Sequence, residues 1–237
     1  MSAGIRIETA TEDWFLTPGG NRITMGIRPG SSDWNTCNAC NGTNDEYRIP
    51  QGITGWALDV GAHIGAATVP LLVDNPGLRC IAIEALPENV VMLMANLERN
   101  GVSDRASVLM LAASDSHRWV TIGYGPSEGE LSHSEYIGGS GNAYPGARSV
   151  SVRGVSLRGA LLYRGPDQDE PVVWTKIDCE GCEYPFLASP DIGLLERIVG
   201  EVHFGAQRLR DILEPTHDVK VERDFGLFEA VLKEEAR

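Results

Sequence analysis

Short apolar runs alternate with amphipathic segments along the chain from residue 56 onward. Because strands and helices that take turns are typical of βα units, this pattern predicts a mainly parallel sheet with helices on both faces. The expected strands are residues 56–62, 78–85, 106–115, 148–157 (as an edge strand), 171–178 and 197–204. The expected helices are residues 64–73, 87–101 and 206–216. Pro70 should kink the first helix or divide it into two short pieces.

The C-terminal part of the chain differs from this rhythm. Residues 218–234 contain two alternating runs that meet at a turn of sequence DFG, which predicts an antiparallel hairpin. Residues 123–146 are rich in Gly, Ser and Tyr and form a long loop. Its tyrosines, Tyr124, Tyr136 and Tyr144, suit a lid over a sugar or polyketide, and disorder is the competing interpretation.

Length and charge restrict the class of protein. With 237 residues, of which 42% are hydrophobic, the chain is expected to form one globular domain over residues 1–237. The formal net charge of −13 argues against partners that are held through phosphates, so neither nucleic acid nor an anionic membrane is expected. The N-terminus lacks a basic region followed by an apolar stretch, which predicts a soluble, cytoplasmic protein. A homo-oligomer is compatible with the sequence.

The most informative motif is LDVGAHIG, residues 58–65. Gly61 and Gly65 allow a tight turn and the close approach of a ligand, and they lack the G-x-G-x-x-G spacing of a nicotinamide site. Glu84 ends the next strand, where a carboxylate can accept hydrogen bonds from both hydroxyls of a ribose. Asp59 suits a cofactor that carries an ammonium and a sulfonium. A purely structural glycine turn is the alternative, and His63 within it is expected to cap or pack.

Several segments in the same order resemble the FkbM-type S-adenosylmethionine-dependent methyltransferases. These segments are ALDVGAHIGAATVPLL (57–72), IAIEALPENVVMLMANLERNG (81–101), AASD (112–115), KIDCEGCE (176–183) and EVHF (201–204), with IRPGSSDWNTCNACNGTNDEYRIP (27–50) upstream. The likeness covers roughly residues 25–205. It departs from the family at Ala85, where proline is usual, and at Cys179 and Cys182, which replace aliphatic or small residues.

This resemblance implies a fold, a cofactor and a reaction. The fold is the Rossmann-like class I methyltransferase fold, with a mainly parallel seven-stranded sheet. The cofactor is S-adenosylmethionine, and the reaction is O-methylation of a sugar, polyketide or other natural product. The cofactor-binding residues that it implies are Asp59, Gly61, Ala62, Gly65, Glu84, Ala113 at the adenine and Asp178 beside the methionine part.

Methyl transfer to an alcohol requires positioning and the removal of a proton. His203, at the end of an expected strand, is the first candidate for the base, ahead of Glu201 two residues before it. Its alternative role is that of a histidine hydrogen-bonded at a strand terminus. Asp178 and Glu180 are the second choice, because carboxylates there can orient the hydroxyl or hold a divalent cation that acidifies it. The metal requirement stays open.

The segment before the core is expected to choose the substrate. We divide the domain into a substrate-covering segment, residues 1–50, and a Rossmann-like core, residues 51–237. Arg28, Asp33 and Tyr47 are its candidate substrate-binding residues, and a solvated surface is the alternative for each.

The cysteines leave three interpretations open. Cys37 and Cys40 form one Cys-x-x-Cys pair, and Cys179 and Cys182 form another. The four can hold zinc if the fold brings them together, they can act as redox pairs, or they can be packed or free thiols, which is the preferred interpretation. Cys80 lies in an apolar strand, and the odd count of five fits a reducing compartment.

We therefore expect an S-adenosylmethionine-dependent O-methyltransferase of small molecules. One alternative is a methyltransferase that acts on a carboxylate, amine or peptide. Another is a non-catalytic regulatory module that binds the cofactor or zinc.

Overall fold

The computed structural model of the chain describes residues 10–124, 135–136, 148–167, 169–203, 205–222 and 226–236. Its centre is a seven-stranded sheet with the strand order β12-β13-β11-β10-β3-β4-β5. The strands are β3 (Gly55–Val60), β4 (Leu78–Glu84), β5 (Ala106–Met110), β10 (Val172–Ile177), β11 (Arg197–Val202), β12 (His217–Val221) and β13 (Gly226–Leu232).

The pairing of these strands confirms the predicted sheet. The pairs β4–β5, β3–β4, β10–β3 and β10–β11 are parallel, whereas β13 runs antiparallel to both β11 and β12. The predicted C-terminal hairpin is therefore present. Its DFG turn lies largely outside the described residues, because only Gly226 of the three is described.

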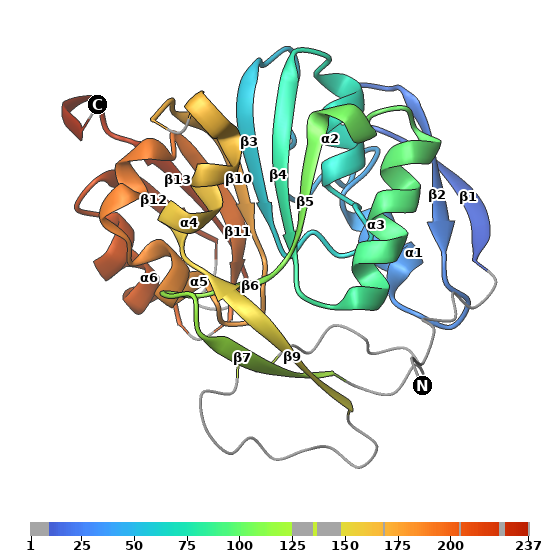
Figure 1. Ribbon diagram of the computed structural model, residues 1–237. Helices are drawn as coiled ribbons and strands as arrows, with labels where there is room; N and C mark the ends of the chain where they lie inside the picture. The colour runs from blue at the N-terminus through green and yellow to red at the C-terminus, as the bar shows by residue number, and fades with distance from the viewer. Residues whose placement is uncertain are drawn as a thin grey trace.

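Helices cover both faces of the sheet, as Figure 1 shows. One face carries α2 and α3, and the other carries α4, α5 and α6, each packed on its own apolar core. The helices are α1 (Asp33–Ala39), α2 (Thr68–Asp74), α3 (Pro87–Arg99), α4 (Leu157–Leu161), α5 (Glu183–Leu187) and α6 (Ala206–Leu213), with short 3-10 turns at Ser103–Arg105, Leu162–Asp167, Pro190–Leu194 and Glu234–Ala236. None of the helices within the described ranges combines the length and the apolar character needed to cross a membrane.

Alternation along β3 explains the two cores. Trp56, Leu58 and Val60 pack on the face of α4 to α6, and Ala57 packs on the face of α2 and α3. Pro70 does not kink α2, because the helix begins at Thr68 and proline in a first turn interrupts no internal hydrogen bond.

The N-terminal elements were not predicted as strands or as a helix. The strands β1 (Thr11–Leu16) and β2 (Arg22–Ile27) form an antiparallel pair, followed by α1. Asn96 of α3 anchors β2, since its side chain accepts a hydrogen bond from the Gly26 N–H at 2.7 Å. Asn96 also donates to the carbonyl of Ile64 at 2.9 Å, which links the N-terminal pair to the turn after β3.

A second sheet lies beside the first, with the order β6-β9-β7-β8. Its strands are β6 (Ala112–Ala113), β7 (Trp119–Tyr124), β8 (Glu135–Tyr136) and β9 (Arg148–Val155). The prediction of an edge strand at 148–157 is therefore wrong for the main sheet, because β9 pairs with β6 and β7 instead. In Figure 1, β7 and β9 form a ribbon that extends from the carboxyl edge of the main sheet. Residues 125–134 and 137–147, which include Tyr144 of the predicted lid, lie outside the described residues, as do the side chains of Tyr124 and Tyr136.

The strand order changes direction between β3 and β10. From β3 the chain adds β4 and β5 on one side, and later adds β11 beside β10 on the other. In open α/β sheets such a switch point leaves a crevice at the carboxyl ends of the strands, where ligands bind. The turn after β3 and the loop after β10 meet there.

Candidate active site

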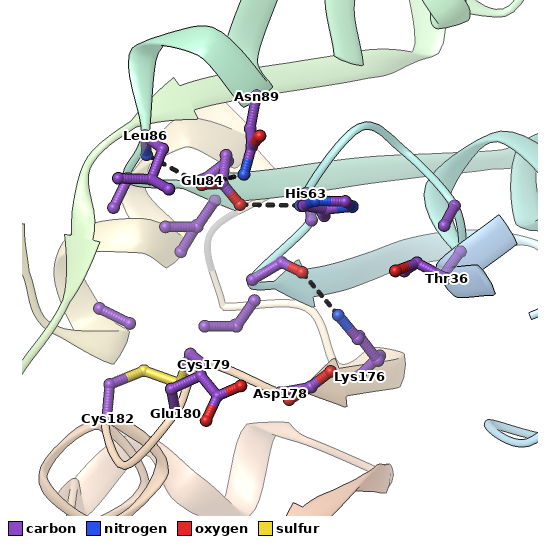
Figure 2. A pocket seen from close by; sticks show the side chains of 18 of the residues that line it. Thr36, His63, Glu84, Leu86, Asn89, Lys176, Asp178, Cys179, Glu180 and Cys182 are labelled. Carbon is purple, nitrogen blue, oxygen red and sulfur yellow. Dashed lines mark hydrogen bonds between the residues drawn. A yellow bond between two sulfur atoms is a disulfide. The ribbon is translucent and has the colours of Figure 1, made fainter. Parts of the chain in front are cut away.

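A cavity of about 370 Å³ opens at the carboxyl ends of β3, β4 and β10. Its wall comes from α1 and the residues after it, from the ends of these three strands, and from β6 and β7. In Figure 2, Glu84 lies on one side of this cavity, and Asp178 and Glu180 lie on the other. Its volume is that of a small-molecule pocket.

Glu84 is fixed by the backbone around it. The Oε2 atom accepts the N–H of His63 at 2.8 Å, and Oε1 accepts the N–H of Leu86 at 2.8 Å and the amide of Asn89 at 3.3 Å (Figure 2). Burial raises the pKa of Glu84, and these three donors oppose that shift. The carboxylate is thus held in one orientation at the end of β4, on the wall of the cavity.

An apolar slot adjoins Glu84. Leu86, Ala112 and Ala113 line it together with Val120 and Ile122 of β7. These side chains make this part of the cavity apolar. Ala113, which the resemblance places at the adenine, is one of them.

The turn after β3 requires glycine at position 61. Gly61 has φ 77°, and a Cβ atom there would lie 1.8 Å from the carbonyl oxygen of Asp178. Gly65 has another function, because a Cβ atom there would meet Leu93 of α3 at 2.9 Å, so it permits packing of the turn on that helix. Gly61 and Ala62 line the cavity, whereas Gly65 does not.

Asp59, which was predicted to carry charge toward the cofactor, does not line the cavity. It is fully buried, and it accepts a hydrogen bond from Thr68 at 2.5 Å. Lys176 Nζ lies 3.4 Å from its Oδ1 and donates to the carbonyl of Gly61 at 2.6 Å. Burial opposes the charge on Lys176, but Asp59 and Asp178 raise its pKa above the ordinary value. Lys176 therefore neutralises Asp59 and stabilises the glycine turn through its hydrogen bond to the carbonyl of Gly61.

Arg28 and Asp33 form a buried ion pair behind the site. The guanidinium donates to both Asp33 oxygens, at 2.9 and 2.7 Å, and to the Asn89 side chain at 2.8 Å. Burial alone would raise the pKa of Asp33, but Arg28 holds it below the usual value. Neither residue, although predicted to bind substrate, lines the cavity. They act on the site through Asn89, which holds Glu84.

His63 lies in the same region and lines the cavity. Its Nε2 is 3.6 Å from Asp33, and burial lowers its pKa to about 4. The imidazole is therefore neutral near pH 7.

The other end of the cavity is rich in carboxylates. Glu46, Asp178, Glu180 and Glu201 all line it. Tyr47, the third predicted substrate residue, also lines the cavity and donates its hydroxyl to Asp178 Oδ2 at 2.8 Å. Burial, together with the charge of Asp178, raises the pKa of both Glu46 and Glu201. These are proton acceptors of more than ordinary strength for carboxylates.

His203 lies beside these carboxylates and outside the cavity wall. Its Nδ1 is 3.1 Å from Glu183, and its Nε2 is 3.3 Å from Glu180 and 3.7 Å from both Asp178 and Glu201. Burial alone would lower the pKa of His203, but the bond to Glu183 and the charges of Glu180 and Asp178 raise it to about 9. With this pKa the ring holds a proton at neutral pH, and the predicted role of His203 as the base would require the ring to lose that proton first.

The two Cys-x-x-Cys pairs do not form a zinc site. Cys179 and Cys182 are joined in a disulfide, whereas Cys37 and Cys40 are buried free thiols of the α1 region. The clusters of metal-ligating side chains found among the described residues include neither Cys37 nor Cys40. The four-cysteine zinc site is therefore wrong, and Cys80 is a buried thiol in β4, as predicted.

Comparison with known families identifies the chain. Residues 59–230 match the model of the methyltransferase FkbM domain. The chain belongs to the FkbM methyltransferase family. This match covers the glycine turn, Glu84 and the whole carboxylate end from Asp178 to Glu201, and with the sheet order it confirms the predicted class I methyltransferase fold.

Solved structures with similar folds are methyltransferases of distant sequence. Precorrin-6y C5,15-methyltransferase from Geobacter metallireducens is 12% identical, with 84% of this chain and 86% of that chain covered and a TM-score of 0.44. TrmK from M. capricolum, in complex with S-adenosyl-homocysteine, is 9% identical, with 80% and 67% covered and a TM-score of 0.46. A human methyltransferase 10 domain-containing protein is 12% identical, with 76% and 72% covered and a TM-score of 0.43. The search of curated proteins gave no match.

The cavity unites most of the predicted residues of this FkbM domain and adds others. Gly61, Ala62, Glu84, Ala113, Tyr47, Asp178 and Glu180 line it, whereas Asp59, Gly65, Arg28, Asp33 and His203 do not. Sequence reasoning did not select Lys176, Asn89 or Glu46. Lys176 stands two residues before Asp178 in the quoted KID motif, and Asn89 lies in the first turn of α3, so both were within the motifs without being assigned.

Proposed function

We propose that this FkbM-family protein uses S-adenosylmethionine to methylate a hydroxyl group of a small, uncharged, polar molecule. One observation carries the proposal: a single cavity joins the Glu84 end, which suits a nucleoside, to the carboxylate end at Asp178. A ligand that spans both ends would contact Glu84, which can bind a ribose, and the carboxylates near Asp178, which can accept a proton.

The residues at the Glu84 end fit the cofactor. The slot between Ala112, Ala113 and Ile122 suits an adenine ring, and the fixed carboxylate of Glu84 suits the two ribose hydroxyls. The turn at Gly61 and Ala62 would hold the methionine part near Asp178. When bound, S-adenosylmethionine supplies a methyl group activated by a positively charged sulfur.

The carboxylate end supplies the proton acceptor. Oxygens of Asp178 and Glu201 and a ring nitrogen of His203 lie within 4.8 Å of one another, so the two carboxylates work as a pair beside an imidazolium. We assign the proton of the acceptor hydroxyl to this pair. Tyr47, bonded to Asp178, orients the carboxylate, and the charge of His203 keeps the pair in place.

The charge of this end favours some acceptors over others. Glu46, Asp178, Glu180 and Glu201 would repel a phosphate or a carboxylate, which counts against the carboxylate-acceptor alternative and against nucleic acid. They would attract an amine, so an amine acceptor is the second candidate. An amine must lose its proton before it attacks, whereas a hydroxyl does so during transfer.

Residues 1–50 contribute to the same end. Thr36, Glu46 and Tyr47 line the cavity, which supports the proposal that this segment covers the substrate and forms one domain with residues 51–237.

The first test removes the proton acceptors. We expect Asp178→Asn and Glu201→Gln each to lower kcat by about 100-fold or more, because a positioned base contributes about that much. S-adenosylhomocysteine should still bind to Glu201→Gln within about threefold of wild type, because Glu84 and Asp178 are unchanged in that variant. The assay measures S-adenosylhomocysteine formation with a panel of polyhydroxylated, amine and carboxylate acceptors.

The matched control is Asp104→Asn, which makes the same change at an exposed carboxyl in the turn Ser103–Arg105, outside the cavity wall. It should keep full activity. Equal activity in Asp178→Asn and wild type would remove the carboxylate from the mechanism. Tight cofactor binding without turnover of any acceptor would instead support a regulatory module.

A further inference from the structure

The disulfide between Cys179 and Cys182 forms part of the cavity wall. Figure 2 shows it next to Glu180 and Asp178, on the side of the cavity opposite Glu84. Cys179 is partly exposed, whereas Cys182 is 5% exposed. A thiol that enters the cavity can therefore reach the sulfur of Cys179 first.

This disulfide closes a ring of four residues whose backbone is unusual. Glu180 has φ 57° and Gly181 has φ 102°, and a left-handed conformation is rare for a residue with a side chain. The disulfide helps to keep Glu180 in that conformation. When the sulfur atoms are no longer bonded they must move apart to van der Waals distance, and the loop loses its covalent constraint.

The same loop holds His203 through Glu183. The N–H of Gly181 donates to Glu183 Oε2 at 2.8 Å, and Glu183 Oε1 lies 3.1 Å from His203 Nδ1. Cys179 Sγ is also 3.8 Å from Glu183 Oε2. A change in the loop is thus transmitted to the imidazolium beside Asp178 and Glu201.

We propose that Cys179 and Cys182 form a redox site whose disulfide keeps the acceptor end of the cavity in its active arrangement and whose reduction by a dithiol lowers methyl transfer. The expected effect on turnover rests on the proposed function. The expected effect on structure is a more mobile loop at residues 178–183, and it is independent of the proposed function.

The reaction is thiol–disulfide exchange. A thiolate of the dithiol attacks Cys179 Sγ, the bond between the two cysteines breaks, and its electron pair goes to Cys182 Sγ, which takes up a proton. The second thiol of the reductant then attacks the mixed disulfide and releases Cys179, which is also protonated. The protein gains two electrons and two protons, and the dithiol becomes a disulfide.

The remaining thiols make this site easy to follow. Burial raises the pKa of Cys37, Cys40 and Cys80, so these three are poor nucleophiles in the folded protein. Alkylation of the folded chain should therefore report on Cys179 and Cys182.

The experiment compares the oxidised protein with protein treated with dithiothreitol. Intact mass after N-ethylmaleimide should show no adduct before reduction and two adducts after it. We expect reduction to lower kcat/KM for an acceptor at least fivefold and to change the affinity for S-adenosylhomocysteine less than threefold. Hydrogen exchange at the Gly181 amide should become at least tenfold faster, and reoxidation should restore both readouts.

The double variant Cys179→Ser/Cys182→Ser should behave like the reduced protein and ignore dithiothreitol. Two outcomes overturn the proposal: a disulfide that dithiothreitol does not reduce in the folded protein, or a reduced protein with unchanged exchange at Gly181 and, where turnover is measurable, unchanged turnover. If no acceptor is turned over in the oxidised protein, the proposed function fails, and the exchange measurement still decides whether the redox site exists.

Discussion

At the scale of single residues, charged side chains around the site are stabilised by partners of opposite charge rather than by solvent. Lys176 and Asp59 neutralise each other beneath the glycine turn, and Arg28 and Asp33 do so behind Glu84. His203 is the positive charge beside the acceptor carboxylates, bonded to Glu183. Each of these charges thus has a partner of opposite sign, which is the condition for burying it at moderate cost.

The pKa of His203 makes stability depend on pH. The folded protein has a pKa of about 9 at this ring, and an unfolded histidine has about 6.5, so the folded state holds the proton more tightly between these values. The stabilisation is fully present below about pH 6.5 and is lost as the pH rises through about 9. Glu183, Glu180, Asp178 and Glu201 face the ring and are the source of this effect.

We therefore expect His203→Gln to reduce the free energy of unfolding more at pH 6 than at pH 9.5. Urea unfolding of both proteins at the two pH values measures the difference. His117→Gln is the control, because it makes the same change at an exposed histidine and should give no such pH dependence. A His203→Gln deficit that is equal at both pH values would contradict a protonated ring.

At the scale of elements, the site depends on how closely the ends of β3 and β10 approach. The N–H of Asp178 donates to the carbonyl of Val60 at 3.0 Å, and Gly61 follows directly with no room for a Cβ atom. Any side chain at position 61 would push the loop that carries Asp178 away from the cofactor turn.

Two glycine variants distinguish the effect of a steric clash from the effect of an unfavourable backbone conformation. Gly61 and Gly101 both have left-handed φ angles, 77° and 67°, but a Cβ atom at Gly101 would meet nothing within 4 Å. Gly101→Ala should lower the free energy of unfolding by about 1 kcal/mol through conformation alone. Gly61→Ala should lower it by about 3 kcal/mol or more and abolish binding of S-adenosylhomocysteine. Equal effects of the two changes, measured by urea unfolding and calorimetry, would refute the close approach.

The elements also show what the sequence could predict. Strands β3, β4 and β10 were predicted within a residue or two because their apolar runs are continuous and bounded by turns. The pair β1–β2 and helix α1 were missed, since six- and seven-residue elements of mixed polarity carry little periodicity. Strand β9 was predicted in place but assigned to the wrong sheet, because its partners are set by tertiary pairing.

The candidate site was predictable to a similar degree. Motif spacing located Gly61, Glu84 and Asp178 on the cavity wall. It could not show that Lys176 neutralises Asp59, or that Glu183 stabilises the protonated form of His203, because both effects depend on distances across the fold. The same holds for the disulfide, whose cysteines were expected to be packed or free thiols.

At the scale of the whole molecule, the fold brings three distant parts of the chain to one edge of the sheet. The segment around Tyr47, the strand end at Glu84 and the loop at Asp178 meet where the strand order reverses. The FkbM family match begins at residue 59, so Tyr47 and Glu46 come from outside the matched region. We propose that variation in that segment changes the choice of acceptor and leaves the residues around Glu84 unchanged.

The most direct test of the central claim is a crystal structure of the protein with S-adenosylhomocysteine bound. We predict that the ribose hydroxyls bond to the carboxylate of Glu84, that the adenine lies beside Ala113 and Ile122, and that the sulfur faces Asp178 and Tyr47. A ligand bound away from Glu84, or one whose sulfur points away from Asp178, would contradict the account.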